Sequence, residues 1–257
     1  MILTIDIGNT RIKSASWHAG VIVHRAAHAY EVGEYASAFD EVFTAQDRPS
    51  RVLAVCVAGE EMQMQLNEWV MRHWQLEVEY LRTQKRYKNI VHAYNNPDQH
   101  GVDRWVGIVA AHQAYPGDSV CVISAGTATT FDLIDESGKH LGGYILPSYV
   151  TMRASLLTDT AKVSSVLNEN FSDGEVPDNT SDAVNQGCHK LLQAGIREIC
   201  AIAQNEMSEP IQIIVTGGYA EVILKYPNMP TMQHEPDLVM QGVYGIAMDQ
   251  QNSGAGT

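Results

Sequence analysis

Apolar positions along the chain fall into short runs and amphipathic stretches, and this pattern begins twice. Residues 1–18 predict two strands joined by a tight turn, and further helix and strand patterns follow. After a Pro-Gly break, residues 119–135 again predict two strands joined by a tight turn. We therefore expect an α/β protein with two similar halves, residues 1–116 and 117–257, and a ligand cleft between them.

The same pattern gives the individual elements. Strands are expected at residues 1–7, 11–18, 21–29, 51–58, 76–83, 140–147 and 211–218, besides the pair within 119–135. Helices are expected at residues 34–43, 61–74, 102–115, 148–160, 181–205 and 236–248. Residues 85–101 have the composition of a polar loop, and the small polar tail at 250–257 is expected to fray.

Composition and charge narrow the function classes. With 45% hydrophobic and 18% charged residues, the chain has the composition of a globular protein. A net charge of −13 argues against general nucleic-acid binding and against anionic lipid, although backbone dipoles and a metal can still hold a nucleotide. The pattern shows no transmembrane stretch or signal peptide, and the four cysteines are scattered. We expect a cytoplasmic protein that binds neither nucleic acid nor membrane.

The first tight turn has the residues of a phosphate-binding loop. Gly8 lets the backbone approach a phosphate, Asn9 and Thr10 add donors, and Lys13 adds a cation. Asp6 could hold Mg²⁺ through oxygen. An ordinary Gly-Asn hairpin would contain the same residues. The turn is neither a P-loop nor a Rossmann turn, because the next element has the pattern of a strand.

The second tight turn strengthens this interpretation. Thr127, after Gly126, offers both its hydroxyl and its backbone N–H to a phosphate. Two such loops on opposing halves would hold one nucleotide between them. The threonines that follow are accounted for by strand propensity. A third glycine turn, at residues 216–218, is placed like an adenosine-side loop, and a simple strand-to-helix turn explains it equally well.

Asp103 is the main catalytic candidate. It stands where a polar loop enters a helix, so the helix dipole favours its ionised form. An ionised carboxylate beside a hydroxyl can accept its proton during phosphoryl transfer. Arg104 could bind a substrate carboxylate through two hydrogen bonds. The alternative is a common helix start in which Asp103 and Arg104 form a surface pair.

Taken together, these motifs resemble the type III pantothenate kinases, of the actin-like, sugar-kinase-like ATPase superfamily. The resemblance covers most of the chain and implies two actin-like, ribonuclease H-like α/β halves with an ATP cleft between them. The matching stretches, in chain order, are DIGNTRIK at 6–13, Y-x-N-P at 94–97, GVDRW at 101–105, GTATTFD at 126–132, GGYILP at 142–147, NTSDAVNQG at 179–187, VTGG at 215–218 and EPDLVMQGV at 235–243.

The resemblance also implies an activity and its residues. The reaction is the ATP-dependent phosphorylation of pantothenate to 4'-phosphopantothenate, the first step of coenzyme A biosynthesis, with Asp103 as the proton acceptor. The implied ATP-binding residues are Asp6, Ile7, Gly8, Asn9, Thr10, Arg11, Ile12, Lys13, Gly126 and Thr127. The implied pantothenate site comprises Tyr94, Gly101, Val102, Arg104 and Thr180. Family members are cytoplasmic homodimers that use Mg²⁺ and a monovalent cation such as K⁺ or NH₄⁺. The resemblance places the dimer interface in the second half of the chain, and Thr180 would reach across it.

Two positions depart from the family pattern. Ser124 stands where the family usually has an aspartate that resembles a monovalent-cation ligand, and serine offers only a neutral oxygen. We therefore expect the requirement for K⁺ to be weakened or lost while kinase activity is kept. Ser148 stands where the family usually has glycine, which leaves the geometry of that turn open.

Two other function classes stay open at this point. One is another phosphotransferase or phosphohydrolase of the superfamily, such as a sugar or acetate kinase, although these usually have longer chains and lack Y-x-N-P followed by GVDR. The other is a non-catalytic regulatory or accessory nucleotide-binding protein. Among the remaining residues, we assign Trp69, Met71 and Trp74 to a helix face on the core, His100 to a solvated loop, and Asp132 to structural support.

Overall fold

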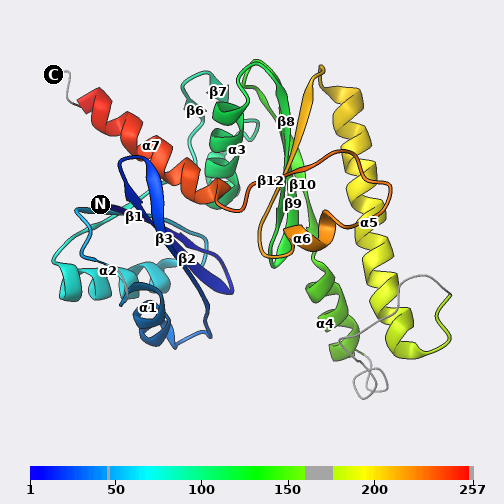
Figure 1. Ribbon diagram of the computed structural model, residues 1–257, viewed down its shortest axis with the longest axis horizontal. Helices are drawn as coiled ribbons and strands as arrows, with labels where there is room; N and C mark the ends of the chain where they lie inside the picture. The colour runs from blue at the N-terminus through cyan, green and yellow to red at the C-terminus, as the bar shows by residue number, and fades with distance from the viewer. Residues whose placement is uncertain (45–46, 160–175, 255–257) are drawn as a thin grey trace. The chain divides into compact units, whose positions relative to one another are not determined.

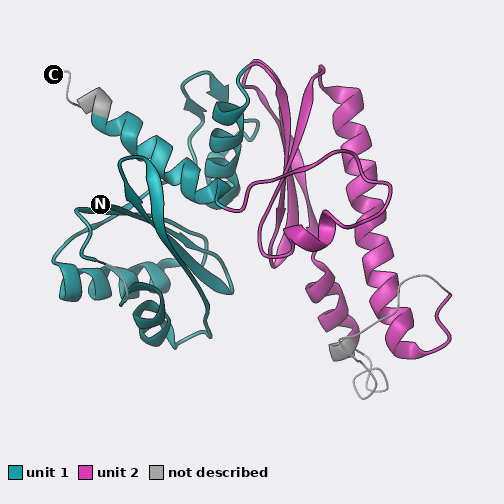
Figure 2. Ribbon diagram, viewed as in Figure 1, with its two compact units in different colours: residues 1–116, 237–257 teal, residues 117–236 magenta. Residues whose placement is uncertain are grey.

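A computed structural model describes residues 1–44, 47–159 and 176–254 (Figure 1). The chain forms two compact units, which Figure 2 colours separately. Unit 1 comprises residues 1–116 and 237–257, and unit 2 comprises residues 117–236. The division after residue 116 coincides with the expected one, but the closing segment belongs to unit 1, whereas we expected it in the second half.

Unit 1 is built on a five-stranded sheet of order β3-β2-β1-β4-β5. Its strands are β1 (Ile2–Ile7), β2 (Arg11–His18), β3 (Val21–Ala29), β4 (Arg51–Cys56) and β5 (Val78–Tyr80). Strand β1 runs antiparallel to β2 and parallel to β4. Helices α1 (Tyr35–Phe43) and α2 (Glu60–Trp74) pack on one face of this sheet with Leu3, Ile5 and Ile7 of β1. Because side chains alternate along a strand, Thr4 and Asp6 point to the other face.

Helix α7 (Leu238–Gly254) belongs to unit 1 because its contacts are with α3 (Val102–Ala114) and with the sheet. A Cβ at Gly242 would collide with the carbonyl oxygen of Val106, so only glycine allows this close approach of the two helices. Tyr244 stacks on Trp17, with 4.3 Å between ring centroids. Helix α7 continues to Gly254, whereas the sequence pattern predicted that it would end at residue 248.

The segment expected as a polar loop contains regular structure. Strands β6 (Arg86–Tyr87) and β7 (Ile90–Val91) form a small hairpin, and η1 (Pro97–Gln99) is a turn of 3₁₀-helix. The hairpin is too short to leave a period-2 pattern that sequence reading could detect.

Unit 2 repeats the sheet of unit 1, with strand order β10-β9-β8-β11-β12. Its strands are β8 (Ser119–Ala125), β9 (Ala128–Ile134), β10 (His140–Pro147), β11 (Ile211–Thr216) and β12 (Gln233–His234). In both units the central strand has an antiparallel hairpin partner and a parallel partner. The long helix α5 (Thr180–Glu206) and the short helix α6 (Ala220–Ile223) cover the apolar face, and α4 (Tyr149–Asp159) follows β10.

Most expected elements are present. The strand expected at 76–83 is shorter, at Val78–Tyr80. Trp69 and Trp74 are buried in the core as expected, whereas Met71 is 49% exposed, so its place on the core face was wrong. No described helix is long and apolar enough to cross a membrane.

Candidate active site

The first turn of unit 1 is a tight β-hairpin between β1 and β2. The N–H of Gly8 donates to the carbonyl of Arg11 at 3.0 Å. Tyr30, directly after β3, fixes the turn from the side, because its hydroxyl donates to the Gly8 carbonyl at 2.7 Å and its N–H donates to the Thr10 carbonyl at 3.2 Å. Asn9, Thr10 and Arg11 are exposed at this turn.

The two residues that flank the first turn could contact a ligand there only through their backbone atoms. Ile7 and Ile12 pair across the two strands, and both side chains are fully buried in the core of unit 1. A contact of either residue with ATP could therefore use only its backbone. The core thus anchors both ends of the turn, while the polar residues between them stay accessible.

Asp6 and Lys13 give the turn its charges. Strand pairing places them opposite one another, and Lys13 Nζ lies 3.8 Å from Asp6 Oδ2. Asp6 is only 8% exposed. The pKa of Asp6 is raised to about 6, because burial and, to a smaller extent, the charge of Asp103 raise it by more than Lys13 lowers it. The influence of Asp103 indicates that the two carboxylates lie near each other in unit 1.

Asp103 lies in the first turn of α3, as expected. A Cβ placed on Gly101 would lie 2.6 Å from Asp103 Oδ1, so the carboxylate folds back over the residue that precedes the helix. Gly101 accepts the first helical hydrogen bond, from the N–H of Trp105 at 3.0 Å. Val102, Asp103 and Arg104 are all half-buried at this helix end. The positive end of the helix dipole therefore acts on a carboxylate that is partly open to a ligand.

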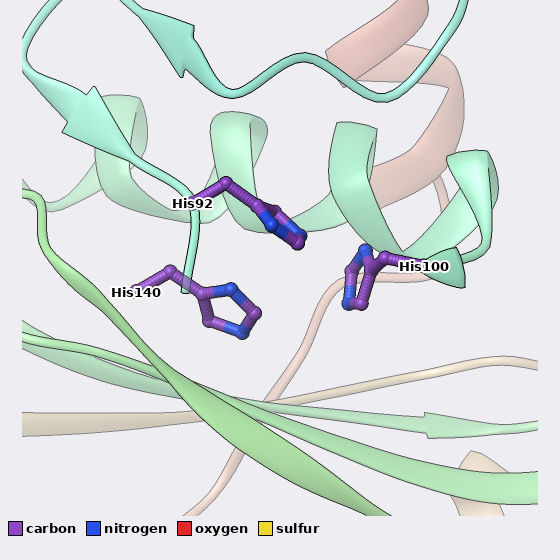
Figure 3. A group of neighbouring side chains, drawn as sticks. All are labelled: His92, His100 and His140. Carbon is purple, nitrogen blue, oxygen red and sulfur yellow. The ribbon is translucent and has the colours of Figure 1, made fainter. Parts of the chain in front are cut away.

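The loop before α3 carries Tyr94. Its backbone N–H donates to Nδ1 of His92 at 3.1 Å, and its ring packs edge-on against His92 and His100 at 5.1 Å each. Figure 3 shows the rings of His92 and His100 close together, with 4.7 Å between centroids. His100 is only 2% exposed, so our assignment of it to a solvated loop was wrong. The loop folds back on α3, where His92 also packs against Trp105.

The second turn, in unit 2, is a similar hairpin between β8 and β9. The N–H of Gly126 donates to the carbonyl of Ala128 at 3.0 Å, and both Gly126 and Thr127 are exposed. The third glycine turn packs directly on this hairpin. Gly217 has φ +96°, and a Cβ there would collide with the backbone of Ala125. The N–H of Tyr219 also donates to the Ala125 carbonyl, at 3.0 Å.

Comparison with known proteins connects this geometry to a family. The family model described as "Type III pantothenate kinase" matches residues 2–202. The chain belongs to the type III pantothenate kinase family. A type III pantothenate kinase of Nitrosococcus oceani is 32% identical over 253 residues, 97% of this chain and 94% of that protein. One from Laribacter hongkongensis is 33% identical over 229 residues, 88% of this chain and 90% of that protein.

Solved structures share the fold of this pantothenate kinase family member. A putative 2-dehydro-3-deoxygalactonokinase of Sinorhizobium meliloti is similar with a TM-score of 0.62 at 10% identity, covering 97% of this chain and 99% of that one. A putative Baf family transcriptional activator of Campylobacter jejuni has a TM-score of 0.60 at 20% identity, with 97% and 99% covered. These likenesses confirm the actin-like α/β fold expected from the sequence.

The first departure from the pantothenate kinase pattern, Ser124, lies one pair before the second turn. It pairs with Thr130 on β9 and with Thr216 on β11. In unit 1 the same place, one pair before the turn, is taken by Asp6 with Lys13 opposite. The second turn therefore has hydroxyls at the positions where the first turn has an ion pair.

The second departure, Ser148, acts as the N-cap of α4. Its Oγ accepts a hydrogen bond from the N–H of Thr151 at 3.2 Å, and its carbonyl accepts one from the N–H of Met152 at 2.9 Å. Thr151 Oγ1 donates to the carbonyl of Thr127 at 2.7 Å. A serine is thus well accommodated where the family usually has glycine, and α4 is tied to the second turn.

Thr180 is exposed at the start of α5. The preceding residue, Asn179, caps the helix by accepting from the N–H of Asp182 at 3.0 Å. Thr180 lines a largely apolar cavity of about 700 Å³ in unit 2, together with Met152, Leu156 and Leu191. Asp132 is buried within unit 2, 3.3 Å from His140, the third side chain drawn in Figure 3.

Sequence reasoning found the two turns and the start of α3 because each has a local signature. It missed Tyr30 and Thr151, which hold the two turns in place. Neither carries a motif, because each acts through a contact with a residue more than 20 positions away. Only the tertiary structure brings such pairs together.

Proposed function

We propose that the protein phosphorylates pantothenate with ATP, giving 4'-phosphopantothenate and ADP, the first step of coenzyme A biosynthesis. The observation that carries this proposal is that unit 1 holds both the buried Asp6–Lys13 pair beside the first turn and the half-buried Asp103 at the start of α3, in a chain of this family. A base for the acceptor hydroxyl and a cation for the phosphates are the two charges that phosphoryl transfer needs.

In the proposed reaction, Asp103 accepts the proton of the primary hydroxyl of pantothenate as its oxygen bonds to the γ-phosphorus. The bond between that phosphorus and the β,γ-bridging oxygen breaks, and ADP leaves. Lys13 and the exposed donors of Asn9 and Thr10 would hold the phosphates from the first turn. Gly126 and Thr127 would donate to phosphate oxygens from the second turn.

The acceptor would be held by the segment that leads into α3. Tyr94, Gly101, Val102 and Arg104 all belong to this segment, and Arg104 can hold the carboxylate of pantothenate through two hydrogen bonds. These assignments follow the family resemblance, and the compact folding of the loop onto α3 supports them.

Asp6 is the proposed Mg²⁺ ligand. A buried carboxylate whose pKa is raised, with a second carboxylate nearby, is a donor set that fits a hard divalent cation. Mg²⁺ bound there would neutralise charge on the phosphates during transfer.

For the monovalent cation, we propose that the neutral Ser124 removes the requirement for K⁺ or NH₄⁺. Calorimetric titration of ATP is then expected to give the same affinity with and without K⁺. A marked tightening of ATP binding at low K⁺ concentration would contradict this proposal.

A homodimer, with Thr180 contributing to the site of the partner, is also proposed from the resemblance. Thr180 is exposed and lines the same largely apolar cavity as the exposed Leu191, which supports this idea. Light scattering of the full chain checks it, and a monomeric mass at assay concentration would contradict it. The cytoplasmic location expected from the sequence stays a prediction.

The deciding experiment is incubation with ATP, Mg²⁺ and pantothenate, with the product identified by mass spectrometry. Wild type is expected to form 4'-phosphopantothenate, and Asp103→Asn is expected to lose roughly 100-fold to 10,000-fold in rate. Asp98→Asn is the matched control, because Asp98 is an exposed aspartate in the same loop. ATP turnover without pantothenate would favour another phosphotransferase or phosphohydrolase. No turnover at all would favour a regulatory nucleotide-binding protein.

A further inference from the structure

Lys85 lies just before β6, and its side chain bridges the loop that carries Tyr94. Its Nζ donates to the carbonyl of His92 at 2.9 Å and to the carbonyl of Tyr94 at 2.8 Å. Its own carbonyl accepts a hydrogen bond from the N–H of His92 at 3.0 Å. One lysine thus contacts two carbonyls on either side of the bend that presents the Tyr94 side chain.

The far end of the loop is fixed by a second side chain from the segment between β5 and β6. Thr83 Oγ1 donates to the carbonyl of His100 at 2.9 Å, next to the residue that precedes α3. Between these anchors, the N–H of Tyr94 donates to His92 and the N–H of His100 donates to the carbonyl of Pro97 at 2.9 Å. The backbone from His92 to His100 is therefore held at three points by residues 83 and 85.

We infer that Lys85 is a positioning residue for the acceptor substrate. It sets the bend at Tyr94, and so the distance of Tyr94 from the start of α3, where Asp103 lies. The inference rests on the proposed function, because it takes Tyr94 to line the pantothenate site. The loop carbonyls that Lys85 contacts lie outside the β6–β7 ladder, so the ammonium supplies hydrogen bonds that the hairpin does not.

Because Lys85 is exposed, we can distinguish a role in positioning the loop from a role in stabilising the whole fold. An exposed lysine contributes little to the overall stability of a fold through its charge. Its loss should therefore disturb the local loop and leave the sheet and α3 folded. The other interpretation is that Lys85 attracts the anionic substrate by charge alone.

Arg86 distinguishes these two interpretations. It is the adjacent residue, it is exposed, and it carries the same charge. Lys85→Met and Arg86→Met remove the same charge from the same hairpin, but only Lys85→Met removes the donors to the carbonyls of His92 and Tyr94.

The kinetic test compares both variants with wild type under pantothenate and ATP titration. For Lys85→Met we expect the KM for pantothenate to rise about ten-fold, with kcat and the KM for ATP within about two-fold of wild type. Lys85→Arg should recover most of the loss, because a guanidinium can also donate to two carbonyls. An equal effect of Arg86→Met, or a rise of both KM values together with a fall in Tm, would overturn the inference.

Amide hydrogen exchange of the free protein gives a readout that does not depend on the reaction. We expect faster exchange of residues 92–100 in Lys85→Met and unchanged exchange in Arg86→Met. Unchanged exchange in Lys85→Met would overturn the inference even if the wild type is an active pantothenate kinase. Failure of the wild type to phosphorylate pantothenate would instead overturn the proposed function.

Discussion

The two units have five-stranded sheets of the same topology, and each has a tight glycine turn in the equivalent hairpin, β1–β2 in unit 1 and β8–β9 in unit 2. The side chains next to the two turns nevertheless differ in charge. In unit 1, Asp6 and Lys13 form a charged pair next to the turn. In unit 2, the corresponding pair is Ser124 and Thr130. The repeated architecture thus supports one turn with charge and one turn without it.

The difference extends to what holds each turn in place. The first turn is held by Tyr30, the residue that follows β3, and has exposed side chains. The second is packed against the backbone at Gly217 and tied to α4 through Thr151. On our proposal, unit 1 would supply the charges of the reaction, while unit 2 would supply backbone and hydroxyl donors.

Asp6→Asn breaks this comparison most strongly, because it removes the carboxylate of the charged pair and leaves Lys13 without its acidic partner. We expect the rate of phosphorylation to fall roughly 100-fold or more, since the cation ligand is lost. We also expect the variant to be more stable than wild type at pH 8. The folded pKa of Asp6 is raised from 3.8 to about 6, which corresponds to roughly 2 to 3 kcal/mol at about 1.4 kcal/mol per unit.

The sign of this effect follows from proton binding. Between about pH 4 and pH 6 the folded state holds a proton on Asp6 that the unfolded state has released, so stability falls as the pH rises through this range. Chemical denaturation at pH 4 and pH 8 measures it. A stability gain in Asp6→Asn that is the same at both pH values would contradict the assignment.

Gly217→Ala tests the packing that fixes the second turn. The new Cβ would collide with the backbone of Ala125, in a conformation with φ +96° that alanine rarely adopts. We expect a loss of about 3 kcal/mol in unfolding free energy and weaker ATP binding. Gly218→Ala is the matched control, since nothing lies within 4 Å of its Cβ position. Equal destabilisation by both variants would show that this contact is not what holds the turn.

Gly101→Ala should lower kcat about ten-fold with little change in Tm, because the added methyl group displaces the Asp103 carboxylate while the hydrogen bond from the N–H of Trp105 to the carbonyl of residue 101 is kept. A double-mutant cycle checks the cause. In the Asp103→Asn background, Gly101→Ala should cost almost nothing further. A full additional ten-fold loss there would mean that the glycine acts through something other than Asp103.

Thr151→Val is expected to have the smallest effect. It removes the donor to the Thr127 carbonyl and should raise the KM for ATP about three-fold to five-fold, with the KM for pantothenate unchanged. Thr151→Ser keeps the hydroxyl and should behave as wild type. A shift in the KM for pantothenate but not for ATP would show that α4 serves the acceptor site instead.

The sequence was informative where the determinants are local. Both hairpins, their glycine turns and the start of α3 at Asp103 follow from apolar alternation, turn residues and an acidic helix start. The unit that α7 joins was not predictable, since it depends on the close approach of Gly242 to Val106. The buried state of His100 and the bridge from Lys85 depend on how a polar loop folds back, which composition alone does not encode.

The most direct test of the charged first turn and neutral second turn is a single-turnover reaction in buffer free of K⁺ and NH₄⁺. Wild-type protein, ATP, Mg²⁺ and pantothenate are mixed, and 4'-phosphopantothenate is measured over time. The account predicts full product formation at a rate that added K⁺ does not change by more than about two-fold. Product that forms only after K⁺ is added, or no product under either condition, would contradict it.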